Sequence, residues 1–366
     1  MSAENKRKIV LEDGQEYVGD AFGADGERIL ELVFNTSMVG YQEILSDPSY
    51  TDQAVVMTYP LIGNYGMADD DYESLRPSIG ALVVREYNDE PSNFRSTKTL
   101  GSVMKQYGIV GVSGVDTRKL ARSVRDYGSR LALLTDADTP LDVCLEKLRT
   151  YKAPTDQVSR VSCREPWVSQ PTGASKSGRM LHVVAIDCGM KQNIVRSLNR
   201  RGCLVTTVPW NTPAERILAE KPDGIFISNG PGDPKDVQQT IATVRKLVGT
   251  CPVFGICLGH QILSLALGAE TYKLTFGHRG GNHPVKDLAT GKIEITSQNH
   301  SYAVDEKSLA GTPLRATHIN LLDGTVEGIA AADLRAFSVQ YHPESAPGPQ
   351  DSGYLFDRFL CMMEGQ

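Results

Sequence analysis

Strand-like and helix-like segments alternate in the second half of the chain, and this pattern constrains the fold more than any other feature. Short apolar runs are each followed by a segment with helical periodicity, and glycine ends several of those helices. The expected strands are 181–186, 203–208, 224–228 and 252–256, and the expected helices are 192–201, 213–221, 234–248 and a last one that Gly268 ends. Such alternation predicts βαβ units and a parallel, doubly wound sheet, which binds ligands at the carboxyl ends of its strands.

The stretch from Pro252 to Gln261 is typical of a buried strand that turns directly into a helix, with Cys257 at the bend. Gly255 and Gly259 remove the side chains that would clash in so tight a turn. A turn of this kind presents the residue at its apex to an open site, as a nucleophile requires. Taken alone, the same feature is more typical of a buried structural cysteine, because free cysteine is among the most buried residue types.

A possible partner for the cysteine lies near the end of the chain. Residues 336–341 alternate like a half-buried strand and lead into His342, Pro343 and Glu344. Side chains two residues apart in extended backbone project to the same face, so His342 and Glu344 can point into one cleft. Pro343 suits the end of a strand because it donates no hydrogen bond. Alone, the three residues would indicate a solvated loop; with a glycine-flanked cysteine they indicate a base and the group that orients it.

The composition is that of an ordinary soluble protein. The 366 residues suffice for two domains, with 40% hydrophobic and 22% charged residues. A net charge of −6 argues against nucleic-acid binding. The seven cysteines are odd in number and unclustered, so they indicate neither a disulfide framework nor a zinc knuckle. The sequence has neither an apolar run of about 18 residues nor a signal-like N-terminus, so we expect a cytoplasmic protein that does not enter a membrane.

The first half of the chain has a different pattern. Short β-like runs separated by glycine and polar turns lie at 8–11, 30–35, 54–58, 78–84 and 130–134, and the fewer helices are expected chiefly at 94–107 and 117–127. Residues 152–179 are rich in proline, glycine and serine without a sustained period, which indicates a linker. The predicted organisation is a β-rich α/β domain at 1–151, a linker at 152–179 and a doubly wound, mostly parallel domain at 180–366.

Several motifs resemble a known family. The pattern Gly-x-Cys-x-Gly-x-Gln at 255–261, His-Pro-Glu at 342–344 and Gly-Pro-Gly-Asp-Pro at 230–234 make the second half similar to class I, triad-type glutamine amidotransferases. The blocks at 34–43, 47–50, 58–66 and 114–118 look like the small subunit of carbamoyl phosphate synthetase. The resemblance covers nearly the whole chain, and the N-terminal blocks are the more specific part of it.

The resemblance implies that Cys257 attacks the side-chain amide of glutamine to give a γ-glutamyl thioester and ammonia, after which water releases glutamate. His342 would serve as the base and Glu344 would fix its tautomer, as in other triads. The backbone N–H groups of Leu258 and Gly232 would stabilise the oxyanion. Glutamine-binding residues carried over from the family are Ser49, Gly230, Gly232, Leu258, Gln261, Asn299, Ser301 and Tyr302.

Some of these residues carry particular expectations. Ser49 would reach the ligand from the N-terminal domain, which would place the site at a domain interface. Glycine is usual in the family at the position of Ser301. Serine can still offer its backbone groups to glutamine there, unless that contact needs a positive φ. An aromatic residue is usual in place of Cys188, which we expect to pack rather than to act as a second nucleophile.

The sequence predicts neither a metal nor a cofactor on this chain. His260, His278, His283 and His300 are expected to be structural or to lie at the rim of the site, because no carboxylate or cysteine spacing completes a zinc set. A phosphate-binding G-x-x-x-x-G-K-[ST] motif does not occur. ATP and Mg²⁺ are therefore expected on a separate large subunit.

The resemblance implies a glutaminase subunit in a heterodimer or a higher oligomer of heterodimers. Its large partner would receive ammonia by an enclosed path and make carbamoyl phosphate from bicarbonate and ATP, for arginine or pyrimidine biosynthesis. The alternatives are a free-standing Cys amidase and a catalytically silent regulatory subunit. The intact set Cys257, His342 and Glu344 argues against the silent subunit.

Overall fold

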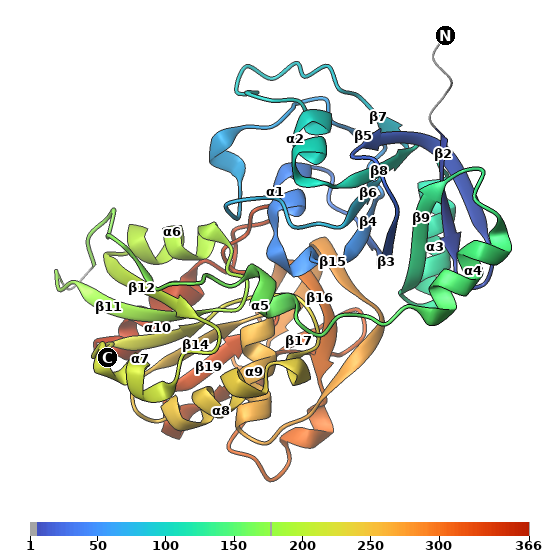
Figure 1. The fold of residues 1–366 in the computed structure, drawn as a ribbon. Coiled ribbons are helices and arrows are strands. Elements are labelled where there is room, and N and C mark those ends of the chain that lie inside the picture. The colour runs from blue at the N-terminus through green and yellow to red at the C-terminus, as the bar shows by residue number, and fades with distance from the viewer. Residues whose placement is uncertain (1–5, 176–177, 366) are drawn as a thin grey trace. The chain divides into compact units, whose positions relative to one another are not determined.

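A computed structural model describes residues 6–175 and 178–365 of the chain (Figure 1). The structure divides between Pro154 and Thr155 into two compact units, each with its own hydrophobic core. In the described part of the chain, no helix combines the length and the apolar character needed to cross a membrane.

The first unit is built on a closed β-barrel that mixes parallel and antiparallel neighbours. Around the barrel the strands are β1 (Lys6–Leu11), β2 (Glu16–Gly23), β8 (Val110–Ser113), β6 (Ala81–Val83), β4 (Gln53–Met57), β3 (Arg28–Asn35) and β9 (Arg130–Asp136). Its other elements are α1 (Tyr41–Ser46), η1 (Pro48–Tyr50), β5 (Leu61–Ile62), η2 (Asp69–Asp71), β7 (Glu86–Tyr87), α2 (Leu100–Tyr107), α3 (Thr117–Tyr127) and α4 (Leu141–Thr150). This is the β-rich α/β unit predicted from the sequence.

One expected helix of this unit is much shorter in the structure. The sequence predicted a helix over 94–107, whereas α2 begins at Leu100. The side chain of Thr99 accepts a hydrogen bond from the N–H of Ser102 and so caps the helix. An N-cap this far along the segment leaves residues 94–98 outside the helix, because the cap residue itself has extended backbone.

The second unit is an α/β sandwich around one large mixed sheet. The strand order is β10 (Trp167–Ser169), β12 (Cys203–Pro209), β11 (Leu181–Asp187), β13 (Gly224–Ile227), β14 (Val253–Ile256), β19 (Ala336–Val339), β18 (Val326–Ala331), β16 (Ile293–Val304), β15 (Thr271–Asp287) and β17 (Arg315–Asn320). The run from β12 to β19 is parallel, and the strands on either side of that run are antiparallel. The parallel part contains every strand on which the doubly wound prediction was based.

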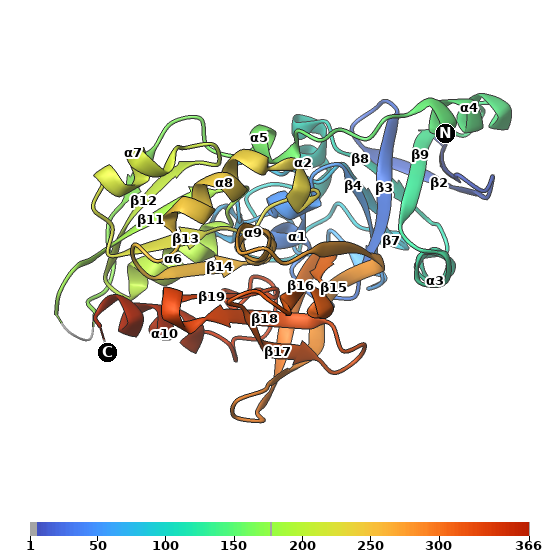
Figure 2. The ribbon, with the colours of Figure 1, turned by 90° about the horizontal axis from the view of Figure 1, so that it is seen from below.

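Helices cover both faces of this sheet (Figure 2). Ile194 of α6 (Gln192–Arg200) and Phe356 of α10 (Tyr354–Met363) share a core with Val183 on one face. On the other face Val184 packs with residues of α7 (Ala214–Ala219), α8 (Gln238–Leu247) and α9 (Leu258–Ala266). Adjacent residues of β11 therefore face opposite cores, which explains its apolar run from Val183 to Ile186.

Part of the segment expected to be a linker is ordered as secondary structure of the second unit. Residues Gln157–Val161 form α5, and Trp167–Ser169 form β10, which pairs antiparallel with β12. An edge strand of three residues carries little periodicity, so the surrounding proline and glycine dominated the sequence pattern.

The sequence analysis did not identify the long hairpin of β15 and β16 or the strands β17 and β18. Polar residues occupy many buried positions of this hairpin, among them His278, Arg279, Gln298 and His300. The usual alternation of apolar and polar residues is therefore missing. This hairpin nevertheless contributes several residues to the candidate site.

Candidate active site

Cys257 lies at the sharp turn between β14 and α9, at the carboxyl end of a central parallel strand. Its backbone has φ 55° and ψ −105°, a conformation that residues with a side chain rarely adopt. The N–H of Cys257 donates to the carbonyl of Val339 at 2.9 Å, which ties the turn to the neighbouring strand β19. Backbone strain at a cysteine, held by the surrounding sheet, is characteristic of a nucleophile elbow.

The two glycines beside the cysteine are required by close backbone contacts. A Cβ on Gly259 would lie 2.2 Å from the carbonyl oxygen of Ile227, and one on Gly255 would lie 2.7 Å from the carbonyl oxygen of Gly259. Both distances are well below van der Waals contact, so neither position accepts a side chain without moving the backbone. The spacing Gly-x-Cys-x-Gly therefore reflects the geometry of the turn itself.

His342 and Glu344 lie just beyond β19, the strand next to the elbow, in a turn where the N–H of Ser345 donates to the carbonyl of His342 at 3.1 Å. His342 Nδ1 and Glu344 Oε1 are 2.7 Å apart, and both side chains are buried. The carboxylate also forms a buried ion pair with Lys191 at 3.1 Å. Burial raises the pKa of Glu344, but the charges of Lys191 and His342 outweigh burial and lower that pKa to about 2.

The imidazole of His342 faces the thiol of Cys257. Burial lowers the pKa of His342, but the charge of Glu344 and the adjacent Cys257 raise it more, and the net shift is upward. His342 Nε2 nevertheless makes no hydrogen bond of normal geometry with a described residue. The thiol instead donates to the carbonyl of Asn299 at 3.5 Å. The S–H must therefore turn from this carbonyl toward Nε2 before a proton can pass, and catalytic hydrogen bonds are often poorly aligned in ligand-free active sites.

The loop after β13 packs against the elbow. A Cβ on Gly230 would lie 2.1 Å from the carbonyl oxygen of Cys188 and 2.8 Å from the side chain of Leu258. Gly232 has φ +87°, a left-handed conformation that favours glycine. Gly230 therefore lies beside the first turn of α9, where Leu258 begins the helix.

Gln261, on α9, holds the strand β16 in place. Its Nε2 donates to the carbonyl of Tyr302 and to Gln340 Oε1, each at 2.9 Å. Both amide protons of Gln261 are donated within the protein. Gln261 can therefore bind a ligand only through Oε1, as a hydrogen-bond acceptor.

Ser301 lies between Asn299 and Tyr302 on the same strand. Its hydroxyl accepts a hydrogen bond from Arg279, and its φ is not positive. The backbone conformation at this position is therefore one that residues other than glycine can adopt.

Ser49 and Cys188 belong to different units of the structure. Ser49 lies in η1 of the first unit, where its N–H donates to Asp47 Oδ1 at 2.9 Å. Its contact with glutamine stays a prediction. Cys188 is fully buried in the core of the second unit, and burial raises the pKa of its thiol, so it packs as expected.

Lys191 is a component of the site that the sequence analysis did not single out. It lies on the loop after β11, and its N–H donates to Asn229 Oδ1 at 3.0 Å. Its ammonium contacts Glu344 and the carbonyl of Ser345, more than 150 residues away in sequence. The segments after β11 and β19 meet only at the carboxyl edge of the assembled sheet, in which β13 and β14 lie between these two strands, so a local motif could not have revealed the pair.

Comparison with known proteins identifies relatives of both units. A family model of class-I glutamine amidotransferases matches residues 184–362, and one of the carbamoyl-phosphate synthase small chain, CPSase domain, matches residues 9–134. The carbamoyl phosphate synthase small chain of Staphylococcus epidermidis is 54% identical over 359 residues, covering 98% of this chain and 96% of that protein. The corresponding protein of Listeria innocua is 51% identical over 358 residues, with 98% and 97% covered.

Among solved structures, that of a putative GMP synthase protein from Thermoplasma acidophilum is also similar to part of this chain. It is 20% identical, with a TM-score of 0.46, and the match covers 51% of this chain and 96% of that one.

Proposed function

The chain belongs to the carbamoyl phosphate synthase small-chain family and is a glutamine amidotransferase, and we propose that Cys257, His342 and Glu344 carry out its glutaminase reaction. The observation that carries the proposal is the strained cysteine of the elbow, facing a histidine whose far nitrogen is 2.7 Å from a buried carboxylate. This is the arrangement of nucleophile, base and orienting acid that acyl transfer requires.

In the proposed reaction, Cys257 Sγ gives its proton to His342 Nε2 and bonds to the side-chain amide carbon of glutamine. His342 then passes that proton to the amide nitrogen, and the C–N bond breaks. Ammonia is released, and a γ-glutamyl thioester remains on Cys257. Water next gives a proton to His342 while its oxygen attacks the thioester carbonyl. The C–S bond breaks, the thiol regains its proton, and glutamate is released.

Glu344 and Lys191 act on His342 in this scheme. The carboxylate of Glu344 accepts from Nδ1–H, so Nε2 is the nitrogen that exchanges protons with the thiol. It also stabilises the imidazolium that forms at each step. Lys191 compensates the buried carboxylate and keeps it ionised.

We assign the stabilisation of the developing oxyanion to the backbone N–H groups of Leu258 and Gly232. Leu258 directly follows the nucleophile, as in other nucleophile elbows. One such donor typically contributes about 3 kcal/mol to transition-state stabilisation. Glutamine itself is proposed to contact Gly230, Gly232, Leu258, Gln261, Asn299, Ser301 and Tyr302, with Ser49 contributing from the first unit.

The product ammonia is proposed to pass through an enclosed path to a large subunit. Ammonia in bulk water is largely protonated and is then no nucleophile. On the large subunit, ATP and Mg²⁺ would convert bicarbonate and ammonia to carbamoyl phosphate for arginine or pyrimidine biosynthesis. We place this heterodimer, or an oligomer of it, in the cytoplasm, where free thiols such as the seven in this chain persist.

The experiment that tests this function is co-purification with the large subunit, followed by assays of carbamoyl phosphate formation. We expect Cys257→Ser to abolish synthesis from glutamine while synthesis from added ammonium continues. Retained glutamine-dependent synthesis would refute the role of Cys257. Glutamine turnover that the large subunit leaves unchanged would instead support a free-standing amidase.

The enclosed path is tested in the wild-type complex with unlabelled glutamine and ¹⁵N-ammonium. An enclosed path predicts that glutamine nitrogen dominates the carbamoyl phosphate formed even when external ammonium is in excess. Free competition between the two nitrogen sources would contradict it.

A further inference from the structure

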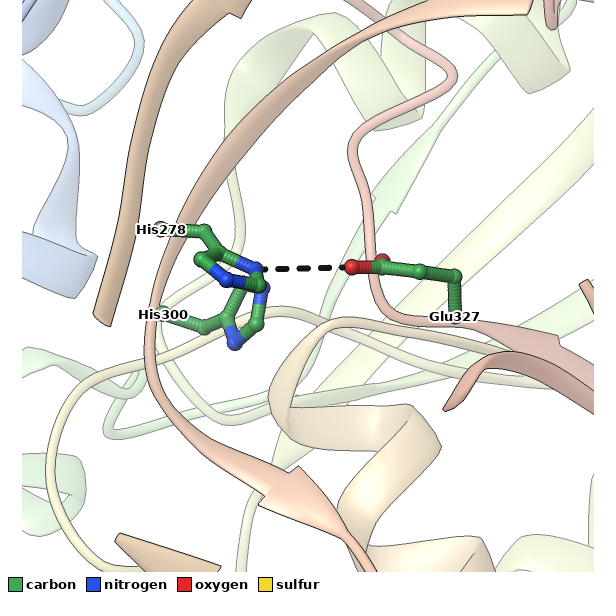
Figure 3. A group of neighbouring side chains, drawn as sticks. All are labelled: His278, His300 and Glu327. Atoms are coloured by element: carbon green, nitrogen blue, oxygen red, sulfur yellow. Dashed lines mark ion pairs between the residues drawn. The ribbon is translucent and has the colours of Figure 1, made fainter. Parts of the chain in front are cut away.

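A second buried cluster of chemically active groups lies in the hairpin of β15 and β16, apart from the triad. His278, His300 and Glu327 come from β15, β16 and β18, and their nearest ligand atoms all lie within 4.8 Å of one another. Figure 3 shows the carboxylate of Glu327 directed at the two imidazole rings. All three side chains are buried, and Glu327 Oε2 has no hydrogen-bond partner among the described residues. A buried carboxylate oxygen without a partner is costly and points to a missing cation or proton.

The orientation of the neighbouring Gln298 follows from its hydrogen bonds. Thr296 Oγ1 donates its only proton to the carbonyl of His283 at 2.9 Å. The same hydroxyl can therefore only accept at its contact with Gln298, which lies 3.2 Å away and must be the amide nitrogen. Gln298 Oε1 consequently faces the two histidines, 2.7 Å from His300 Nε2 and 3.2 Å from His278 Nδ1.

All four ring nitrogens of His278 and His300 then face oxygen acceptors. His278 Nε2 lies 2.8 Å from Asp323 Oδ2, and His300 Nδ1 lies 2.8 Å from the carbonyl of Tyr302. His278 Nδ1 faces Glu327 Oε1 at 3.5 Å as well as the oxygen of Gln298. Two neutral imidazoles carry only two N–H groups, so two of these four nitrogens would direct a lone pair at an oxygen. Relative to two neutral rings, the cluster therefore lacks two positive charges.

We propose that His278 Nδ1, His300 Nε2 and Glu327 bind a single divalent metal ion of the Zn²⁺ class, with Gln298 Oε1 as a fourth ligand. One divalent ion supplies both missing charges at one point, whereas two protons would create adjacent imidazolium rings with centroids 4.9 Å apart. Glu327 and Asp323 balance the charge of the ion.

The geometry suits an ion with nitrogen and oxygen ligands. Adjacent ligand atoms of a tetrahedral Zn²⁺ site lie about 3.3 Å apart, given metal–ligand distances of about 2.0 Å. The separations of His278 Nδ1 from Gln298 Oε1 and from Glu327 Oε1 are 3.2 and 3.5 Å, whereas the 2.7 Å between His300 Nε2 and Gln298 Oε1 must lengthen by about 0.6 Å for both atoms to bind one ion. The far nitrogen of each histidine meets a carboxylate or a backbone carbonyl, the outer contacts typical of metal-bound imidazoles. The sequence analysis expected no metal here because Glu327 is distant in sequence from both histidines.

The site would fix the strand that also faces Cys257. The carbonyl of Tyr302 is shared by His300 Nδ1 and Gln261 Nε2, and the carbonyl of Asn299 accepts from Cys257. An ion bound to His300 would therefore hold both contacts in place. Binding of the ion itself does not depend on the glutaminase reaction, so its test can fail or succeed independently of the proposed function.

The experiment is a titration of the chelator-treated full chain with Co²⁺, a spectroscopic substitute for Zn²⁺. The chain carries Cys257→Ser so that the thiol near His342 cannot bind the ion. We expect one equivalent of Co²⁺ to bind with visible d–d bands and without the near-ultraviolet band of a thiolate ligand. Absence of these bands up to about 100 μM Co²⁺, a concentration at which a Kd of about 1 μM would give saturation, would overturn the proposal.

Matched variants show which residues bind the ion. Glu327→Gln keeps the shape but removes the charge, and should abolish the bands, whereas His283→Asn, beside the cluster, should retain them. Equal binding by these two variants would refute the assignment. Gln298→Glu adds a negative ligand and should bind Co²⁺ at least tenfold more tightly. A folding defect cannot produce tighter binding, so unchanged or weaker binding by a folded Gln298→Glu chain would also count against the site.

Discussion

The buried ion pair between Lys191 and Glu344 allows a quantitative prediction. Substitution of Lys191 by methionine keeps most of the side-chain volume but leaves the carboxylate without its cation. The side chains of Lys191 and Glu344 are 3% and 0% exposed, so solvent cannot replace the lost charge. Breaking a buried pair by removing one partner typically costs about 3–5 kcal/mol.

The lowered pKa of Glu344 gives a second measure of the same interaction. In the folded chain burial raises this pKa, but Lys191 and then His342 lower it, from an ordinary 4.5 to about 2. Because the folded value lies below the unfolded one, the carboxylate stabilises the fold above about pH 4.5, and this stability is lost as the pH falls toward 2. The shift corresponds to roughly 3 kcal/mol, of the same order as the cost of breaking the pair. We therefore expect Lys191→Met to lose about 3 kcal/mol of unfolding free energy at pH 7.

Urea unfolding followed by tryptophan fluorescence measures this loss. Both tryptophans, Trp167 and Trp210, lie in the second unit, so the signal reports on the unit that contains the ion pair. With an m-value of about 2–3 kcal/mol/M, the midpoint should fall by roughly 1 M urea. Lys246→Met is the matched control, because Lys246 and Glu215 are also 3.1 Å apart but 64% and 70% exposed, and should change little. If both variants lose the same stability, burial does not determine the strength of the pair and the reasoning is wrong.

Three further predictions concern the same unit. Gly259→Ala should lower the melting temperature and glutaminase activity, at a cost of about 1–3 kcal/mol or more, because its Cβ would meet a carbonyl oxygen at 2.2 Å. Gly281→Ala, whose nearest atom would be 3.6 Å away, should melt like the wild type, and equal effects of the two substitutions would contradict the steric argument. Glu344→Gln should be less stable than the wild type at pH 6, with a difference that shrinks between pH 4.5 and 2; a difference that does not change with pH in urea unfolding would refute the assigned pKa. Ser301→Gly should change the KM for glutamine by less than about threefold, since the backbone there does not need glycine, and a tenfold decrease in KM would show that it does.

The sequence predicted the site best where its geometry is local. Gly255, Cys257 and Gly259 belong to one turn, and His342 and Glu344 are only two residues apart, so their spacing alone keeps these side chains close. The extended backbone expected between His342 and Glu344 was wrong, because this segment forms a turn beyond β19. The parallel strands were also recognisable because both of their faces are apolar. Lys191 was missed because it meets Glu344 only after distant strands pair.

The hairpin of β15 and β16 was missed for a different physical reason. Its buried positions hold residues such as His278, Gln298 and His300, which have neither the alternation of a strand nor the period of a helix. These side chains contact one another partly across strands, as the contact of Gln298 on β16 with His278 on β15 shows. Hydrogen bonding across strands cannot be read from composition or periodicity.

The buried polar hairpin and the elbow depend on each other through β16. Desolvating so many polar groups is costly unless each finds a partner, so the strand has few alternative positions in which its contacts remain satisfied. That same strand directs the carbonyls of Asn299 and Tyr302 toward Cys257 and Gln261. An apolar hairpin would stabilise the fold without fixing these two oxygens, since hydrophobic packing is not directional. The polar interior of the hairpin is therefore best explained by the need to place β16 accurately beside the nucleophile.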